Sequence, residues 1–248
     1  MIAKITVLME IGDRPNQEDA VNINGRVIQL EHHLSTISTE NLPLLLVLCD
    51  GMGGHAFGEK ASLWTAEAAN RLIDASSARE AMDTLYLIQK ASEKELPPDT
   101  GTTIAFCLIN QKGLIAGNAG DSRVYGIKDQ SIFRITHDHS VVQELVDSGE
   151  ITADEAMRHP LRNLITLGIG PAFSKEWTSP KKAYVVEMEQ IPDYLLLCSD
   201  GLCDNLTDEE ILEHVLLFQD DAPKELFLSA RERTRYLDNV SIILASLK

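Results

Sequence analysis

The strand-like segments of this chain come in groups, and helical segments stand in consecutive pairs between them; this order constrains the fold most. The strand-like segments are rich in β-branched residues or bounded by Gly, Asp and Asn, and they cover residues 3–9, 44–49, 103–109, 113–118, 123–127, 183–188, 194–198 and 240–245. A parallel sheet would need a helix after nearly every strand. The order therefore predicts an α+β fold with two largely antiparallel sheets flanked by helix pairs.

Two helix pairs are expected from apolar residues at helical spacing. The first pair covers residues 58–74 and 79–90. The second begins at Thr207, which forms a capping-box pattern with Glu210, and continues with a helix over residues 223–236.

The length of 248 residues suits one large domain, which we take to span residues 1–248. Region 140–182 is its least regular and most polar part, and is the candidate for a mobile surface flap. A capping-box pattern at Thr152 and Glu155 predicts a short helix there.

The excess of acidic residues limits the kinds of partner that this chain can bind. There are 38 acidic and 22 basic residues, giving a formal net charge of −16. This charge opposes binding to nucleic acid or to an anionic membrane surface, and an anionic substrate would need a local cation clamp. The longest apolar stretch, residues 42–49, is too short to span a bilayer.

The cysteine pattern favours a reducing compartment. The four cysteines lie mostly in apolar runs, form no C-x-x-C pair and follow no secretory leader: Cys49, Cys107, Cys198 and Cys203. We expect reduced core thiols in a cytoplasmic monomer.

The first polar cluster, residues 12–19, places an arginine close in sequence to two adjacent carboxylates. Arg14 could bind a phosphate through its forked guanidinium, beside Glu18 and Asp19. The same residues also suit a surface turn with an exposed ion pair.

An apolar strand that ends in Asp-Gly occurs twice, at Asp50-Gly51 and at Asp200-Gly201. A carboxylate at a strand end and an adjacent glycine carbonyl offer hard oxygen ligands for Mg²⁺ or Mn²⁺. An ordinary strand-to-helix turn would also use Asp and Gly, but three glycines over residues 51–54 exceed what a turn requires. The segment contains no nucleotide-binding glycine motif.

Two more aspartates occupy turns beside strands. Asp121 lies in an ordinary-looking hairpin turn, and Asp238 with Asn239 precedes the last strand-like segment. Together with Asp50 and Asp200 they would crowd one sheet edge with negative charge. Divalent cations would relieve that repulsion, neutralise a phosphate and lower the pKa of a bridging water.

Two histidines are candidates for protonating a leaving group. His55 follows the glycines and His159 lies in the expected flap. For each, a surface or structural role is the alternative.

Six ordered motifs then resemble those of one family, the PPM/PP2C phosphatases, and in particular their bacterial branch. They are residues 14–19, Asp50 to His55 with Gly58-Glu59 and Ala61-Ser62, Gly101-Thr102-Thr103, residues 119–123, residues 199–202, and Asp238-Asn239. The resemblance covers essentially the whole chain. It implies a four-layer α-β-β-α sandwich with a metal cluster at the loop ends of the sheets.

The resemblance also implies a set of metal ligands. Asp50 would bridge two Mn²⁺ or Mg²⁺ ions, and the Gly51 carbonyl would bind one of them. Asp200 and Asp238 would bind the other, and Asp121 with Asp200 would hold a third, weaker ion.

The remaining implied roles concern the substrate. Glu18 and Asp19 would contact metal-bound waters, Arg14 would bind the phosphate, and residues 141–168 would form the flap. Met52 stands where many eukaryotic members have a histidine that is a proposed general acid, so the acid is unassigned. Residues 167–170, Leu-Gly-Ile-Gly, also depart from the expected end of the flap.

The implied reaction is hydrolysis of phosphoserine and phosphothreonine in phosphoproteins by a metal-bridging hydroxide. The substrates would include a Ser/Thr kinase and its targets. Two alternatives remain: a catalytically weak scaffold that binds a phosphoprotein, and a hydrolase of small phosphoesters.

Overall fold

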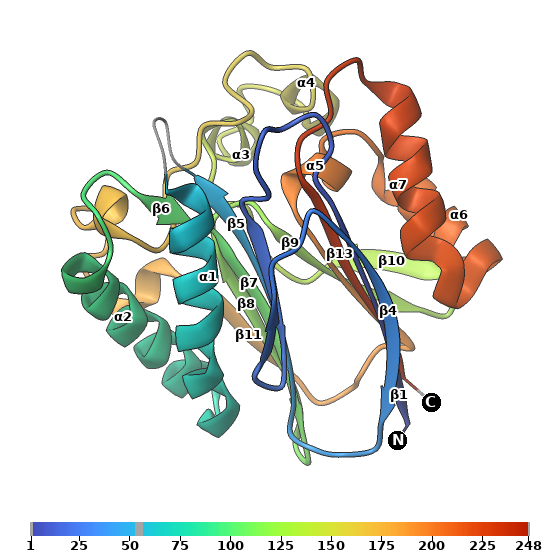
Figure 1. The fold of residues 1–248 in the computed structure, drawn as a ribbon, viewed down its shortest axis with the longest axis horizontal. Helices are drawn as coiled ribbons and strands as arrows, with labels where there is room; N and C mark the ends of the chain where they lie inside the picture. The colour runs from blue at the N-terminus through green and yellow to red at the C-terminus, as the bar shows by residue number, and fades with distance from the viewer. Residues whose placement is uncertain (1, 53–56, 248) are drawn as a thin grey trace.

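The computed structural model describes residues 2–52 and 57–247, which form two β-sheets packed face to face (Figure 1). One sheet has the strand order β10-β9-β12-β13-β1-β4, and the other has the order β11-β8-β7-β5-β2-β3 with β6 paired to β5. Every strand pairing within these residues is antiparallel, in agreement with the prediction of two largely antiparallel sheets. The strands are β1 (Ala3–Glu10), β2 (Asp19–Ile23), β3 (Arg26–Ile28), β4 (His32–Thr39), β5 (Leu44–Met52), β6 (Gly101–Thr102), β7 (Ile104–Asn110), β8 (Gly113–Ala119), β9 (Arg123–Lys128), β10 (Ser131–Arg134), β11 (Tyr184–Met188), β12 (Tyr194–Cys198) and β13 (Val240–Leu247).

Helices cover the outer face of each sheet. In Figure 1, α1 and α2 lie on the sheet that contains β5, β7 and β8, and α6 and α7 lie on the sheet that contains β1 and β13. The α-helices are α1 (Gly58–Ala68), α2 (Ala78–Glu95), α3 (Val141–Asp147), α4 (Ala153–Ala156), α5 (Asp200–Cys203), α6 (Asp208–Phe218) and α7 (Ala222–Arg233). Short 3-10 helices are η1 (Ala69–Asp74), η2 (Pro171–Phe173), η3 (Pro180–Lys182) and η4 (Gln219–Asp221).

The strand β5 shows why these segments form a sandwich. Its residues 44–49 are all buried, because alternate side chains enter different cores. Leu46 and Leu48 pack between the two sheets, whereas Leu45 and Val47 pack under α1 and α2. A third core lies between the other sheet and helices α6 and α7. Three apolar layers separate four layers of secondary structure, so the predicted four-layer α-β-β-α sandwich is confirmed.

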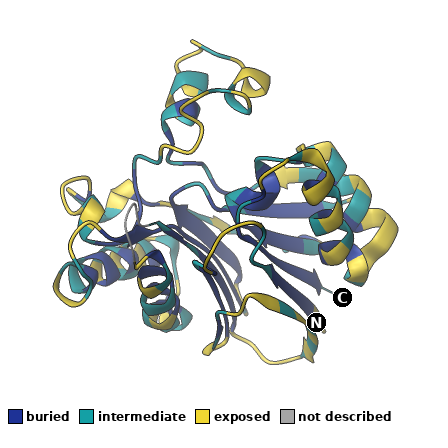
Figure 2. Ribbon diagram, turned by 45° about the horizontal axis from the view of Figure 1, so that its top comes forward, coloured by how far each residue is buried: buried dark blue, intermediate teal, exposed yellow. Residues whose placement is uncertain are grey.

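The region around α3 and α4 projects beyond the strand ends (Figures 1 and 2). Its base is closed by two backbone hydrogen bonds, from Val141 N to Leu164 O at 2.9 Å and from Thr166 N to His139 O at 2.8 Å. Val142 is the only buried residue of α3, and α4 has none. This region therefore has little core of its own.

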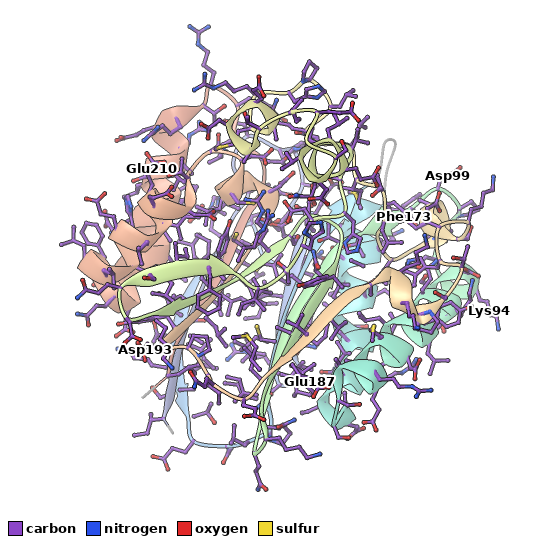
Figure 3. The ribbon with its side chains drawn as sticks, turned by 180° about the vertical axis from the view of Figure 1, so that it is seen from behind. Lys94, Asp99, Phe173, Glu187, Asp193 and Glu210 are labelled. Atoms are coloured by element: carbon purple, nitrogen blue, oxygen red, sulfur yellow. The ribbon has the colours of Figure 1, made fainter. Side chains whose placement is uncertain are left out.

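Seen from behind, β11 runs beside α2 (Figure 3). The Glu187 carboxylate of β11 accepts a hydrogen bond from the backbone N–H of Ala78, the first residue of α2. One end of this helix is thereby tied to the edge of the sheet.

All eight strands predicted from the sequence are present, and five further strands were not predicted. Of these, β4 is an edge strand with alternating exposure and mostly His, Ser and Thr residues, and β2 contains buried polar residues. The remaining three, β3, β6 and β10, have two to four residues each. The predicted helix over residues 58–74 is α1 followed by the 3-10 turns of η1, and the helix predicted to reach residue 236 ends at Arg233.

The four cysteines are free and buried, as predicted. None of the helices in the described ranges is long and apolar enough to cross a membrane.

Candidate metal and phosphate site

A cavity of about 200 Å³ lies where loops from both sheets meet. Its lining residues come from seven separate parts of the chain: Arg14, Glu18, Asp50, Gly51, Met52, Thr103, Asp121, Asn163, Ile165, Asp200, Asp238 and Asn239. The four aspartates of the sequence prediction thus line one cavity together with Arg14, predicted to bind the phosphate, and Glu18, predicted to contact metal-bound waters. Asp50 belongs to β5, Asp200 begins α5, and Asp238 precedes β13.

Close backbone packing explains the glycine after each strand-end aspartate. A Cβ atom on Gly201 would overlap the carbonyl oxygen of Asn239, and one on Gly51 would lie 2.5 Å from the carbonyl oxygen of Glu18. The Gly51 N–H also donates to the Glu18 carbonyl at 3.0 Å. Glycine at these positions therefore brings Asp50 near the β1–β2 loop and Asp200 near the Asp238 segment.

Two threonines fix the backbone of Asp50. The Thr103 hydroxyl accepts from the Asp50 N–H at 3.0 Å, while the Thr102 hydroxyl and the Thr103 N–H both donate to the Asp50 carbonyl at 2.8 Å. The Thr103 hydroxyl is also 2.6 Å from that of Ser122. These contacts hold the strand end, and with it the carboxylate, in one position.

The carboxyl groups of this site resist ionisation. Burial raises the pKa of Asp50 and of Asp200 well above the ordinary value, and the neighbouring carboxylates raise both further. Burial also raises the pKa of Asp121 to about 7, with repulsion from Asp138 and Asp204 adding to the effect. A cation bound here would favour the ionised carboxylates and relieve their mutual repulsion.

Asp19 does not line the cavity but lies opposite Asp50 in the β2–β5 pair. Its side chain is fully buried, and within the described residues neither of its carboxylate oxygens has a hydrogen-bond partner. Burial raises its pKa to about 7, although nearby Ser241 and Ser199 oppose this shift. The Ser241 hydroxyl likewise has no partner in the described part of the chain. These unpaired polar atoms are unusual in a folded core and are typical of a place where an ion or its water shell binds.

Arg14 forms a two-point ion pair with Asp238, whose carboxylate accepts from Nε at 2.6 Å and from Nη2 at 2.5 Å. The partner is 224 residues away in sequence, so Arg14 pairs with the far end of the chain and not with Glu18 or Asp19. Burial raises the pKa of Glu18, and the charge of Arg14 lowers it in part.

Asn239 holds the loop that carries Arg14 and Glu18. Its Oδ1 accepts from the Glu18 N–H at 2.8 Å, and its Nδ2 donates to the carbonyls of Ile11 at 2.8 Å and Asn16 at 3.1 Å. Asn239 is buried, so these bonds are shielded from water. Its position beside the aspartate thus has a structural cause that the sequence did not reveal.

The donor set fits a hard divalent ion that keeps part of its water shell. Within residues 2–52 and 57–247, no group of three or more His, Cys, Asp or Glu side chains is close enough to hold an ion by itself. Mg²⁺ commonly binds one or two carboxylates and retains several waters, and Mn²⁺ accepts the same oxygen donors. Carboxylates around one cavity, the Gly51 carbonyl and the unpaired Asp19 are consistent with such binding.

Of the two histidine candidates, the structure describes only His159, and it does not join this site. His159 is not among the cavity-lining residues, and its Nδ1 accepts from the Leu161 N–H at 3.2 Å. His55 lies outside the described residues. Four lining residues were not singled out as candidates from the sequence: Met52, Thr103, Asn163 and Ile165. Of these, Met52 and Thr103 belong to two of the family motifs, residues 50–55 and Gly-Thr-Thr, whereas Asn163 and Ile165 lie in the expected flap.

Comparisons with known proteins agree with this arrangement. Residues 24–233 match the family described as Protein phosphatase 2C. Serine/threonine protein phosphatase PstP of Mycobacterium tuberculosis is 34% identical over 214 residues, which cover 82% of this chain and 40% of PstP. Protein phosphatase PhpP of Streptococcus pneumoniae is 30% identical over 257 residues, covering 98% of this chain and 97% of PhpP. This chain thus spans well under half of PstP and nearly all of PhpP.

Solved structures show the same fold. Serine/threonine phosphatase Stp1 from Staphylococcus aureus superposes with a TM-score of 0.77 at 31% identity, covering 98% of this chain and 94% of Stp1. The catalytic domain of PstP in complex with two manganese ions gives a TM-score of 0.71 at 28% identity, covering 99% of each chain. The family match covers most of the chain and the fold agrees throughout its length, so this chain belongs to the protein phosphatase 2C family.

Proposed function

We propose that this chain hydrolyses phosphoserine and phosphothreonine in phosphoproteins with the help of divalent metal ions. One observation carries the proposal: four aspartates from separate parts of the chain line a single cavity together with an arginine. The related proteins PstP, PhpP and Stp1 are named as phosphatases, and those with a stated specificity act on serine and threonine.

We assign the metal ligands as follows. Asp50 and the Gly51 carbonyl would hold one Mn²⁺ or Mg²⁺ ion, and Asp50 with Asp200 and Asp238 a second. Asp121 with Asp200 would hold a third, weaker ion. Bound ions would neutralise the substrate phosphate and lower the pKa of a water that acts as the nucleophile.

The side chains around the ions would position the substrate. Arg14 uses two of its five N–H donors on Asp238, which leaves three for phosphate oxygens. Glu18 at the cavity wall and Asp19 opposite Asp50 would accept hydrogen bonds from ordered waters. Asn239 is assigned a positioning role through its bonds to the loop. The proton donor to the leaving group stays unassigned.

The proposal also includes the domain organisation, the substrates, the location and the oligomeric state of the protein. Residues 1–248 would form one catalytic domain, with residues 141–168 as a flap over the substrate. The substrates would be proteins phosphorylated by a Ser/Thr kinase, including that kinase, and the enzyme would act as a cytoplasmic monomer. The names of the relatives support phosphorylated proteins as substrates, and the negative net charge opposes binding to nucleic acid or to an anionic membrane surface.

The test is release of inorganic phosphate from a phosphothreonine peptide, with Mn²⁺ or with EDTA. Wild-type protein should release phosphate only with the metal, and Asp50→Asn should lose at least about a hundredfold in kcat, since a lost electrostatic contact of this kind has effects of that order. Asp83→Asn, an exposed site on α2, is the matched control and should behave as wild type. Absence of metal-dependent release from wild type would disprove the proposal. Turnover of p-nitrophenyl phosphate without peptide turnover would favour a hydrolase of small phosphoesters.

A further inference from the structure

A second, larger cavity of about 630 Å³ adjoins the proposed catalytic cavity and shares two lining residues with it, Asp121 and Asp200. One wall comes from α3 and α4, and the other from α5 and the start of α6. Its volume is within the range of pockets that bind ligands rather than single waters. A substrate whose phosphate occupies the first cavity would have this groove beside its neighbouring residues.

The groove has an apolar part and an acidic part. Its aliphatic lining residues include Val142, Val146, Met157 and Leu206, from both walls. Its charged lining residues are seven carboxylates and three arginines: Asp121, Asp138, Asp154, Asp200, Asp204, Asp208 and Glu209 with Arg123, Arg134 and Arg162. Carboxylates therefore outnumber arginines in the groove by more than two to one, and the groove is acidic.

All three arginines are already occupied by carboxylates. Arg123 forms a two-point contact with Asp138, with Nε and Nη2 at 2.9 and 2.7 Å from Oδ2, and Arg134 Nη1 reaches the same oxygen at 3.1 Å. Asp138 is buried, which strengthens these bonds. Arg162 lies 3.4 Å from Asp204. Little positive charge is left for an acidic or second phosphorylated group.

Two carboxylates of the groove remain available. Asp154 in α4 and Glu209 in α6 are exposed, and neither makes a side-chain hydrogen bond or ion pair with any described residue. Asp208 differs because it accepts a hydrogen bond from the Tyr125 hydroxyl at 2.9 Å. The free acidic groups thus stand on both walls of a groove that aliphatic side chains also line.

We infer that this groove binds the residues that flank the phosphorylated side chain and selects substrates with a lysine or arginine there. The aliphatic stem of such a residue would pack on Met157 and Leu206, and its charged end would reach Asp154 and Glu209. The inference rests on the proposed phosphatase function, because the phosphate must bind in the adjacent cavity. It makes Asp154 and Glu209 residues that determine specificity.

The test compares phosphothreonine peptides that carry a single Lys, Ala or Glu at each position near the phosphothreonine. At the best position, the Lys peptide should exceed the Glu peptide in kcat/KM by about threefold to tenfold, mainly through KM, since partly exposed charge pairs have effects of this size. The preference should shrink at high salt. Each variant is characterised by the ratio of kcat/KM for the Lys peptide to kcat/KM for the Glu peptide. This ratio does not depend on the fraction of folded enzyme.

The double variant Asp154→Asn with Glu209→Gln should bring the ratio close to one. Glu213→Gln is the matched control, because this exposed residue is on the same helix as Glu209 but does not line the groove; its ratio should equal that of wild type. If wild type hydrolyses the peptides with no preference for Lys, or if the double variant keeps the preference, the groove does not select basic residues. If no peptide is hydrolysed under any metal condition, the phosphatase proposal itself is wrong, and this inference falls with it.

Discussion

The Asn239 side chain joins the β1–β2 loop to the segment before β13, and this makes it a sensitive residue of the site. Asn239→Ala would remove three hydrogen bonds and leave the partly buried Glu18 N–H without its partner. An unsatisfied buried group costs about 1–3 kcal/mol. We expect a fall in the free energy of unfolding of that order, measured by urea denaturation. The loosened loop should also raise KM for phosphopeptides, because it carries Arg14.

Asn41→Ala serves as the control for this prediction, since Asn41 is exposed and its side chain makes no hydrogen bond within the described residues. It should change neither stability nor KM. If Asn239→Ala lowered stability without any change in KM, Asn239 would support the fold and not the position of Arg14.

Individual site residues could be predicted from the sequence where a local pattern indicated them. Asp50 and Asp200 were found because an apolar strand followed by Asp-Gly occurs twice. The contact between Arg14 and Asp238 could not be found in this way, because it joins residues at opposite ends of the chain. Thr103 was recognised only as part of a family motif, and its hydroxyl bond to the Asp50 N–H depends on the pairing of strands.

At the level of secondary structure, two helices share one capping arrangement but differ in what they bury. Thr207 before α6 and Thr152 before α4 each form a capping box with a glutamate three residues later. Helix α6 buries Ile211 and Val215 against the sheet, whereas α4 buries no residue. Thr207→Ala should therefore lower the free energy of unfolding by about 1 kcal/mol. Thr152→Ala should leave it nearly unchanged, because α4 can open without unfolding the sandwich.

Urea denaturation of both variants measures this difference, and amide hydrogen exchange in α4 reports the local effect of Thr152→Ala. The helix labelled by Glu210 in Figure 3 is the one whose cap is expected to matter. Equal losses of global stability in the two variants would show that α4 unfolds together with the rest of the chain.

The elements that sequence reasoning missed have a common physical cause. A central strand such as β5 is buried on both faces and has a continuous apolar run, which is easily recognised. The edge strand β4 has one exposed face, and its His, Ser and Thr residues resemble a loop. Strand β2 contains Asp19 and Asn22, buried polar residues whose reason lies in other elements: Asn22 donates to the Ala66 carbonyl of α1 at 2.6 Å.

For the whole molecule, the site opposes folding when no cation is present. The two sheets bring together carboxyl groups whose pKa values are about 7 for Asp19 and Asp121 and well above the ordinary range for Asp50 and Asp200. In the unfolded chain these groups titrate near 3.8. Charging them in the folded state is thus unfavourable, and divalent ions that bind only the folded state would stabilise it.

The sign of the resulting pH dependence follows from linkage. A carboxyl group whose folded pKa is raised contributes its stability below the unfolded pKa and loses it as the pH rises through the folded value. In EDTA, the free energy of unfolding should fall between about pH 5 and pH 7, by up to about 1.4 kcal/mol per pH unit for each carboxyl protonated only in the folded state. His33 and His139 oppose this fall in the free energy of unfolding. Burial lowers their pKa values, so their contribution to stability increases as the pH rises.

Comparison of wild type with Asp200→Asn separates these contributions, since the variant lacks one repelling carboxyl but keeps both histidines. In EDTA, Asp200→Asn should lose less stability than wild type as the pH rises, and above about pH 7 it should be the more stable protein. With saturating Mn²⁺ the order of stability of the two proteins should reverse, because ionised ligands bind the metal more tightly and the variant has lost one of them.

Urea denaturation of both proteins across this pH range, with EDTA and with Mn²⁺, measures all four curves of stability against pH. Parallel curves in EDTA would mean that Asp200 is not protonated in the metal-free fold, and an unchanged order with Mn²⁺ would remove Asp200 from the proposed ligands.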